Sequence, residues 1–219
     1  MRKLLLALAL AALCWQPQQA AAQVPCIGVG GVNTVPQVGI SCAQEPLVSS
    51  YGATSVALVP VAAGATDFLC IGGATGKVIR VQAIRVAGTA GTLVNVPLLV
   101  MKHVSLDTGT ASATTTMIPI PYAMDSNNAA AVAVTRAWIT ANPTIVDAAP
   151  GIIDSADLVL GTSGTILNNT GVVLDYRERN FMQAPTLRKA TEEVCLNLNT
   201  TAVTAGLLYT TVQWTEQAQ

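Results

Sequence analysis

The sequence predicts an all-β protein built as an antiparallel β-sandwich, with a jelly roll as the expected arrangement. Thr, Val, Ala and Gly dominate the chain, and short β-branched runs alternate with Gly, Pro and Asn turn signals. Helix signals are weak, and only the Ala-rich residues 126–138 could form a turn or two of helix. The spacing of the runs predicts about 8–10 strands, which is typical of a sandwich.

The expected strands are separated by turns of small residues, among them the Gly-rich stretches 72–76 and 88–91. The run at 93–104 has the clearest period of two, with one apolar face and one mixed face that includes Pro97 and His103. Because proline donates no ladder hydrogen bond, Pro97 indicates an edge strand or a bulge. The expected strands cover residues 55–63, 67–71, 77–86, 93–104, 111–118, 131–138, 157–160, 171–175, 194–199 and 207–214.

Residues 1–22 have the three parts of a secretory signal peptide. A basic start precedes an uninterrupted apolar run at 4–14, and the small residues 20–22 provide a cleavage site. The apolar run is too short to span a bilayer, and the rest of the chain contains no run of about 18 apolar residues. We therefore expect export without a membrane span, with an N-terminal core helix as the alternative interpretation.

The remaining chain divides into two parts. Residues 23–54 are rich in Gly and Pro and carry no charge before Glu45, which predicts an extended arm. Residues 55–219 contain the expected strands and form the predicted sandwich domain.

Charge is scarce for a chain of 219 residues. Charged residues make up 11% of it and hydrophobic residues 51%, with a net charge of −1, whereas soluble domains carry about 25% charged residues. The balance argues against a nucleic-acid binder that relies on a basic patch. Soluble sheet proteins use charge for solubility and to protect strand edges. The surface must then consist of Thr, Ser, Asn, Ala and Gly, which indicates a homo-oligomer, with a trimer preferred because jelly rolls often pack about a threefold axis.

Four cysteines follow the predicted signal, and an even number in an exported chain indicates disulfides. Cys26 with Cys42 is the first expected pair, because both lie in the N-terminal segment. Cys70 with Cys195 would then join an early strand to a late one, with buried free thiols as the alternative. Zinc binding is not expected, because no C-x₂₋₄-C pair exists and His103 is the single histidine.

The sequence contains no complete catalytic motif, so we expect a protein that is not an enzyme and that has no catalytic, cofactor-binding or metal site. Gly76-Lys77 lacks the remaining P-loop residues, and residues 161–164 lack the G-x-S-x-G spacing of a nucleophile elbow. No Ser or Cys motif accompanies His103, which is expected at the surface or in an interface. Glu192 and Glu193 are adjacent, so in a strand they point to opposite faces and cannot form a glycosidase pair.

Two polar stretches are expected to be ordinary surface features. Residues 125–128 offer oxygen ligands, but Ala130 replaces the glycine of a calcium-binding loop, which favours an Asx-rich turn. Residues 176–179, together with Lys189 and the pair 192–193, hold much of the charge and are expected to form a solvated loop and strand edge. The alternative is the polar rim of a subunit contact.

Several stretches resemble a group of poorly characterised virion-associated, fibre-type structural proteins of tailed phages and prophages. The resembling stretches are TDFLCIGG with KVIRV, DSNNAAA, WITANP, CLNLN and QWTE, which together span residues 66–216. None is a catalytic signature, and the resemblance implies the strands and turns of one sandwich. It also implies other virion proteins as partners.

The sequence therefore favours a non-enzymatic structural or attachment protein in a multimeric assembly, with a phage virion or fibre component as the first hypothesis. The alternative is an exported bacterial surface or periplasmic binding module, with glycans as candidate ligands. The expected location is outside the cytoplasm, or in the virion.

Overall fold

The computed structural model describes residues 48–61, 64–110, 120–147, 149–162, 171–177 and 183–219. The predicted signal peptide, the first part of the predicted arm, Cys26, Cys42 and the strand expected at 111–118 lie outside these residues. Within them no helix is long and apolar enough to cross a membrane. The description below concerns residues from Val48 onward, which form one compact unit.

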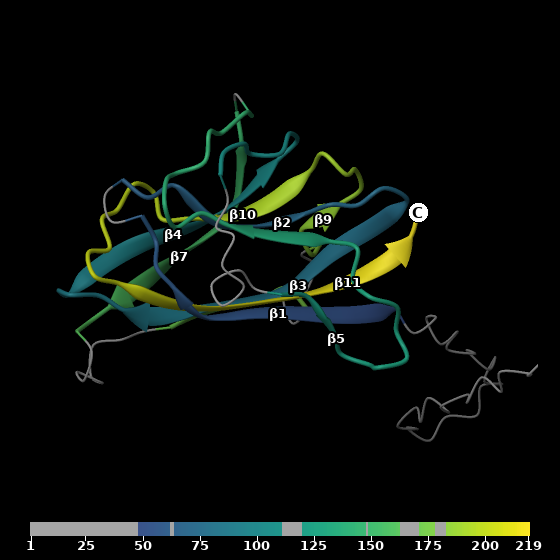
Figure 1. Ribbon diagram of the computed structural model, residues 1–219, viewed down its shortest axis with the longest axis horizontal. Helices are drawn as coiled ribbons and strands as arrows, with labels where there is room; N and C mark the ends of the chain where they lie inside the picture. Colours follow the sequence, from purple (N-terminus) through teal and green to yellow (C-terminus); the bar gives the residue numbers. More distant parts are fainter. Residues whose placement is uncertain (1–47, 62–63, 111–119, 148, 163–170, 178–182) are drawn as a thin grey trace, which may run out of the picture. The chain divides into compact units, whose positions relative to one another are not determined.

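The described chain forms two antiparallel sheets that pack against each other, and this confirms the predicted all-β sandwich (Figure 1). The first sheet contains β1 (Ser49–Leu58), β3 (Lys77–Thr89), β5 (Tyr122–Ala123), β8 (Val172–Asp175), β9 (Thr186–Leu187) and β11 (Leu207–Ala218). Its strands are arranged in the order β5-β1-β11-β3-β8, and β9 also pairs with β3. The second sheet has the order β6-β2-β10-β4-β7; its strands are β6 (Val134–Ala137), β2 (Asp67–Gly72), β10 (Glu193–Asn197), β4 (Val94–His103) and β7 (Gly151–Leu160).

The eight main strands pair in a nested order along the chain. The first of them, β1, pairs with the last, β11, and inside this pair β2 pairs with β10, β3 with β8 and β4 with β7. The β1–β11 and β3–β8 pairs lie in the first sheet, and the β2–β10 and β4–β7 pairs lie in the second. Most pairings therefore join segments that are far apart in the sequence.

The core lies between the inner faces of the two sheets. In β4 the predicted apolar face is confirmed, because Val96, Leu98 and Val100 are fully buried. Trp214 on β11 stacks on Tyr51 of β1, with ring centroids 6.0 Å apart. Trp138 is also buried.

Strand β1 begins at Ser49, inside the segment 23–54 that was expected to be an extended arm. Tyr51 and Ala53 of this strand are buried, and Tyr51 lies opposite Trp214 in the register with β11. The Ser and Gly residues around them carry no strand signal, so this strand depends on its pairing with β11. The residue pattern alone could not reveal it.

Pro97 lies in β4, an interior strand, although the sequence indicated an edge or a bulge. The pairing of β10 with β4 ends where Asn197 meets Leu99, so at Pro97 only β7 accompanies the strand. Among the described residues, no strand pairs with Pro97 on the β10 side, which makes this part of β4 locally an edge, where proline is tolerated.

The Gly-rich stretch after β2 connects it tightly to β3, as predicted, and Gly76 has a φ of +70°. At Gly73 the constraint is a close approach of two backbones. Its N–H donates to the carbonyl of Glu192 over 2.8 Å, and the carbonyl oxygen of Lys189 occupies the place that a Cβ would take. Only glycine fits this position without a shift of backbone.

We expect Gly73→Ala to destabilise the fold by about 1–3 kcal/mol, the usual cost of forcing atoms into a packed site. Gly151→Ala is the matched control, because its nearest neighbour would be the Lys102 carbonyl at 3.9 Å, and the change should stay within about 0.5 kcal/mol. Urea unfolding of both variants measures the difference. Equal stability of the two variants would contradict the close approach.

Candidate functional site

Buried polar side chains gather on the face of the second sheet that points away from the first. Residues that alternate along β10 point to this face, namely Glu193, Cys195 and Asn197. The register places His103 opposite Glu193, Cys70 opposite Cys195 and Asp67 opposite Asn197. All six of these side chains are buried.

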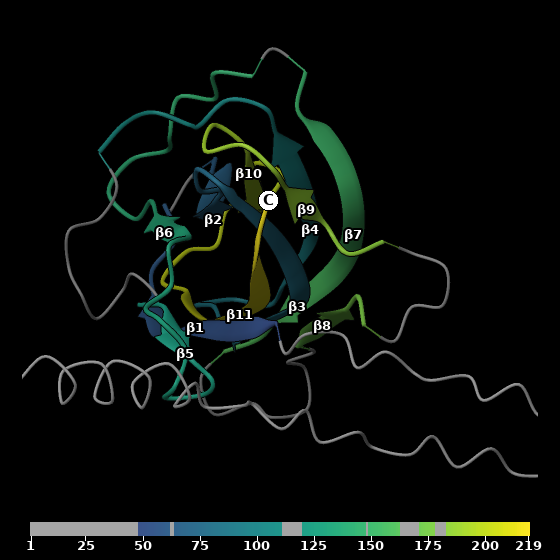
Figure 2. The same ribbon diagram turned by 90° about the vertical axis from the view of Figure 1, so that its right-hand side faces the viewer.

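Two loop segments, 104–110 and 138–147, cover this face. Thr108 and Thr144 join them through a pair of backbone hydrogen bonds of 3.0 and 2.7 Å. Figure 2 shows the loops that follow β4 and precede β7 passing above β2 and β10, on the side away from β1 and β11. The outer face of the second sheet is therefore an interior site with polar contents.

A disulfide between Cys70 and Cys195 lies at the centre of this face. The two residues are direct neighbours in the β2–β10 register, with their Cα atoms 4.1 Å apart, although 125 residues separate them in the sequence. Both are buried, and Trp138 packs with them in a small second apolar cluster. The expected link between an early and a late strand is confirmed; the pair expected for Cys26 and Cys42 lies outside the described residues.

Glu193 is fully buried and is held by two donors. Arg136 on β6 pairs with its carboxylate, and the backbone N–H of Asp107 donates to the same group. Burial raises the pKa of Glu193, while these two partners and His103 act against the increase. The solvated strand edge that the sequence predicted is therefore wrong for Glu193.

Arg136 joins the sheet to its covering loops. Its guanidinium donates to the carbonyl of Asp107 over 2.9 Å and lies 5.4 Å from the centre of the Trp138 ring. One side chain of β6 thereby contacts both loop segments and Glu193 on β10.

His103 lies between two buried carboxyl groups, so the surface position expected for it is wrong. Its Nε2 is 3.2 Å from Oδ2 of Asp67, and its Nδ1 is 3.8 Å from Oδ1 of Asp107. Asn197 donates to the other oxygen of Asp67 over 2.7 Å. We call Asp67, His103 and Asp107 the buried triad.

The buried triad has unusual protonation equilibria. Burial by itself lowers the pKa of His103, but contact with Asp67 and the charges of Asp107 and Glu193 outweigh it, and the pKa is raised. Burial raises the pKa of Asp107 to about 7, with a further contribution from the neighbouring Asp67. Such shifts are common at functional sites and also in structural ion-pair networks.

The solvated loop expected at 176–179 is wrong for Tyr176, which is buried in the core, and residues 178–179 lie outside the described residues. The N–H groups of Asn127 and Asn128 donate to the side chain and the carbonyl of Asp125, over 2.9 and 3.0 Å, which confirms the Asx-rich turn. Arg177 pairs with Asp175 at the surface and lowers the pKa of that carboxyl to about 2.

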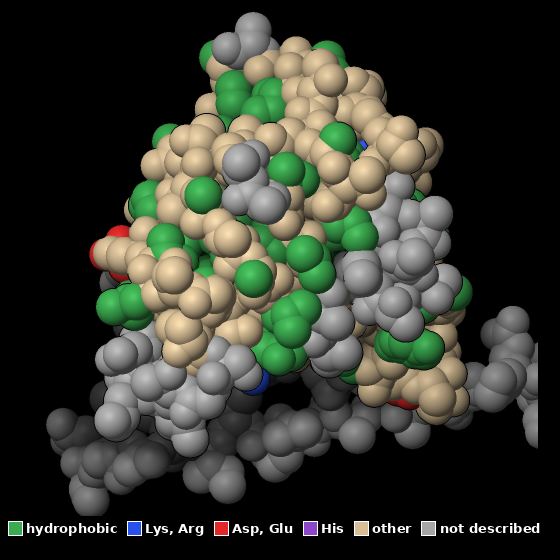
Figure 3. Space-filling model, turned by 60° about the vertical axis from the view of Figure 1, so that its left-hand side comes forward, with side chains coloured by type: hydrophobic (Ala, Val, Ile, Leu, Met, Phe, Trp, Pro, Cys, Tyr) green, Lys and Arg blue, Asp and Glu red, His purple; other side chains and the backbone are tan. Residues whose placement is uncertain are grey.

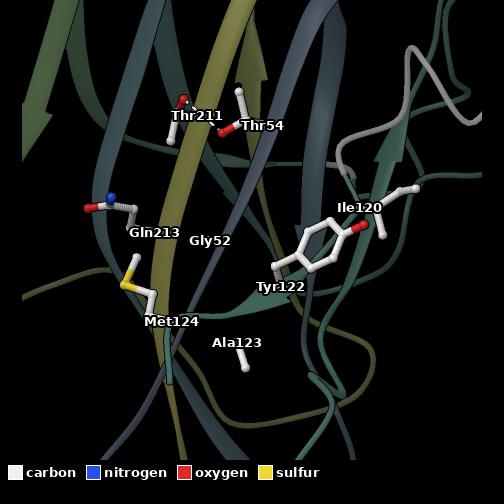
Figure 4. A pocket seen from close by; sticks show the side chains of 8 residues that line it. All are labelled: Gly52, Thr54, Ile120, Tyr122, Ala123, Met124, Thr211 and Gln213. Carbon is white, nitrogen blue, oxygen red and sulfur yellow. Dashed lines mark hydrogen bonds between the residues drawn. The ribbon is translucent and has the colours of Figure 1, made fainter. Parts of the chain in front are cut away.

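A shallow hollow of about 420 Å³ lies on the outer face of the first sheet (Figure 4). It contains no charged side chain among its lining residues, which are Gly52, Thr54, Ile120, Tyr122, Ala123, Met124, Thr211 and Gln213. Gly52 leaves the middle of the hollow open, with Met124 across it, and the hydroxyls of Thr54 and Thr211 are 3.2 Å apart. The Tyr122 side chain is 72% exposed beside these groups.

A second hollow of about 320 Å³ shares Ile120 with the first and follows the chain toward β6. Five large apolar side chains are exposed along this stretch, and together they form what we call the apolar side: Ile120, Tyr122, Met124, Val132 and Val134. Glu216 at the end of β11 fixes the stretch, because its buried carboxylate accepts the N–H groups of Val132 and Ala133 and that of the Trp214 indole.

Comparison of the chain with protein-family models, curated proteins and solved structures finds no match. The candidate sites therefore rest on their own geometry.

No sequence motif marks Asp67, Asp107 or Arg136 as functional residues. Each is an isolated polar residue in an otherwise apolar or small-residue stretch, and no fixed spacing connects them. The one available signal is that a charged residue in a run such as DFLCIG must find partners if the run is buried.

We expect the double variant Cys70→Ser/Cys195→Ser to lose about 2–5 kcal/mol of unfolding free energy, because a link across 125 residues strongly restricts the unfolded chain. Urea unfolding of the oxidised proteins measures the loss. The comparison variant is Cys26→Ser/Cys42→Ser, which removes the same number of cysteines and should lose less stability, because these two are separated by far fewer residues. Unchanged stability of the Cys70/Cys195 variant would contradict a disulfide at this position.

Proposed function

We propose that this protein is an exported, non-enzymatic structural or attachment component that functions as a homo-oligomer, most simply as a trimer in a phage virion or fibre. The apolar side carries the proposal. Four of its five exposed large apolar side chains line two hollows that have no charged lining residue, and exposed apolar surface of this kind marks protein–protein interfaces. A second copy of the chain is the occupant that the low charge favours, because few charges oppose self-association.

The distribution of charge supports the same proposal. Among the acidic residues that the structure describes, four are buried, namely Asp67, Asp107, Glu193 and Glu216, so the described surface carries less charge than the composition indicates. Figure 3 shows a face on which apolar and other uncharged side chains cover nearly all of the described surface, with charged groups only at its margins.

One end of the sandwich also lacks charge. The connections at 59–66, 90–93 and 198–206 contain no charged residue. They are joined by backbone hydrogen bonds, for example from Gly91 to the Thr204 carbonyl and from Thr200 to the Ala65 carbonyl. Such an end favours packing against other protein over free exposure to solvent.

The nested strand pairing supports a jelly roll as the finer description of the sandwich. Eight strands that pair first with last and inward in order, four in each sheet, correspond to one long hairpin rolled over on itself. This fold suits a subunit that packs side by side with copies of itself.

We expect the purified protein to have the mass of a homo-oligomer, and Met124→Glu/Val134→Glu to reduce it to a monomer. Two buried carboxylates at the centre of an apolar contact should weaken association by at least about 30-fold. Size-exclusion chromatography with light scattering at micromolar concentration measures the mass.

Val173→Glu is the matched control, because Val173 is 60% exposed on β8, at the other edge of the first sheet from β5. The control should leave the mass unchanged. A monomeric parent protein, or an oligomer that survives the double substitution, would rule out the apolar side as the assembly surface.

The hollow around Tyr122 supports a second candidate function, glycan binding by an exported surface module. An exposed aromatic ring can stack on the apolar face of a sugar, and the hydroxyls of Thr54 and Thr211 and the amide of Gln213 can bond sugar hydroxyls. In this case the hollow receives a ligand instead of a second subunit.

Two measurements separate the candidates. As a virion component, the protein should co-purify with particles through a density gradient and appear in their mass-spectrometric inventory. As a glycan-binding module, it should bind on a glycan array, and Tyr122→Ala should weaken that binding by about 5- to 100-fold. Absence from purified particles together with Tyr122-dependent array binding would replace the first proposal with the second.

A further inference from the structure

We propose that Asp67, His103 and Asp107 bind one divalent cation of the Zn²⁺ type between the outer face of the second sheet and the loop segment 104–110. The sequence indicated no metal site, because it has no C-x₂₋₄-C pair and a single histidine, and because Asp67 lies far along the chain from His103 and Asp107. The proposal is independent of the assembly function.

Unpaired donor atoms converge at the buried triad. Both ring nitrogens of His103, both carboxyl oxygens of Asp107 and Oδ2 of Asp67 are buried without a hydrogen-bond partner, although they face one another. Buried polar groups are nearly always paired, and a group of unpaired ones requires an explanation. One ring nitrogen of His103 and one carboxyl oxygen of each aspartate can donate lone pairs to a shared cation, which provides one.

The separations fit coordination. Two ligands that are each about 2.1 Å from an ion lie about 3.0–3.4 Å apart in octahedral or tetrahedral geometry. Nε2 of His103 and Oδ2 of Asp67 are 3.2 Å apart. One ligand atom from each of Asp67, His103 and Asp107 lies within 4.8 Å of the others, and Asp107 belongs to a loop, so a small movement completes the set. The Cys195 sulfur lies in the same group but is held in the disulfide.

The charge of the surroundings also favours a dication. Asp67, Asp107 and Glu193 contribute three carboxylates to one buried region, and Arg136 contributes one guanidinium. When the site ligates a cation, the imidazole must be neutral and the carboxylates ionised, which leaves two negative charges among these groups. A divalent cation balances them.

The ligand types select among cations. Mg²⁺ and Ca²⁺ prefer oxygen ligands throughout, whereas imidazole with carboxylates suits Zn²⁺ and its first-row neighbours. Glu193 accepts the backbone N–H of Asp107, and Arg136 donates to its carbonyl, so both orient Asp107 without occupying its carboxylate. The ion would fasten the covering loop to β2 and β4, as a structural site closed to solvent.

The test uses the full chain, purified without a metal-affinity step. Elemental analysis by inductively coupled plasma mass spectrometry should find about one zinc per chain, either as purified or after refolding with Zn²⁺. Refolding with Zn²⁺ instead of EDTA should raise Tm by about 5–10 °C at metal concentrations 100 times Kd. Asp107→Asn should abolish both effects.

Asp147→Asn is the matched control, because Asp147 lies on the neighbouring loop, is half-buried and accepts the backbone N–H groups of Val104 and Ala149, which an Asn side-chain oxygen can also accept. It should keep the zinc and the Tm shift. If Asp107→Asn fails to fold, X-ray absorption at the zinc edge of the unmodified protein tests the proposal instead. A spectrum with nitrogen and oxygen ligands, including imidazole, would support the proposed site. Sulfur ligands, zinc retained by Asp107→Asn, or zinc content near zero with an unchanged Tm would overturn it.

Discussion

The pairing of β10 between β2 and β4 is the constraint on which the rest of this structure depends. It places Val194 and Leu196 in the core between the sheets and turns Glu193, Cys195 and Asn197 to the outer face. Because side chains alternate along a strand, a shift of one residue would exchange these two sets. The Cys70–Cys195 link at the middle of this pairing fixes the register that both the core and the polar face require.

That register gives the molecule two interiors of different chemistry. Between the sheets the contacts are almost entirely apolar, whereas beneath the loops 104–110 and 138–147 a disulfide and Trp138 share the space with ionisable groups. Arg136 and Glu193 connect these groups to the loops. The loops are therefore held by polar contacts and would respond to any ligand that changes the charge of the buried triad.

Scarce charge has opposite consequences inside and outside the sandwich. Several of the few carboxylates are used in the interior, where each organises a neighbouring segment: Glu193 the loop after β4, and Glu216 the stretch that carries the apolar side. Fewer charges remain for the described surface, which also exposes large apolar side chains. The low surface charge favours an oligomer. The buried carboxylate of Glu216 also holds in place the stretch through which we propose that the protein assembles.

The all-β class and most strands follow from the sequence by itself, because period-two burial in runs such as 93–104 is a local property. The link between Cys70 and Cys195 was also among the pairings that the cysteine pattern allowed. Strand β1 from Ser49, the interior position of Pro97 and the burial of His103 were decided only by the tertiary structure. Each depends on which distant segment lies alongside, and the buried triad joins positions 67, 103 and 107 through a register that no local pattern encodes.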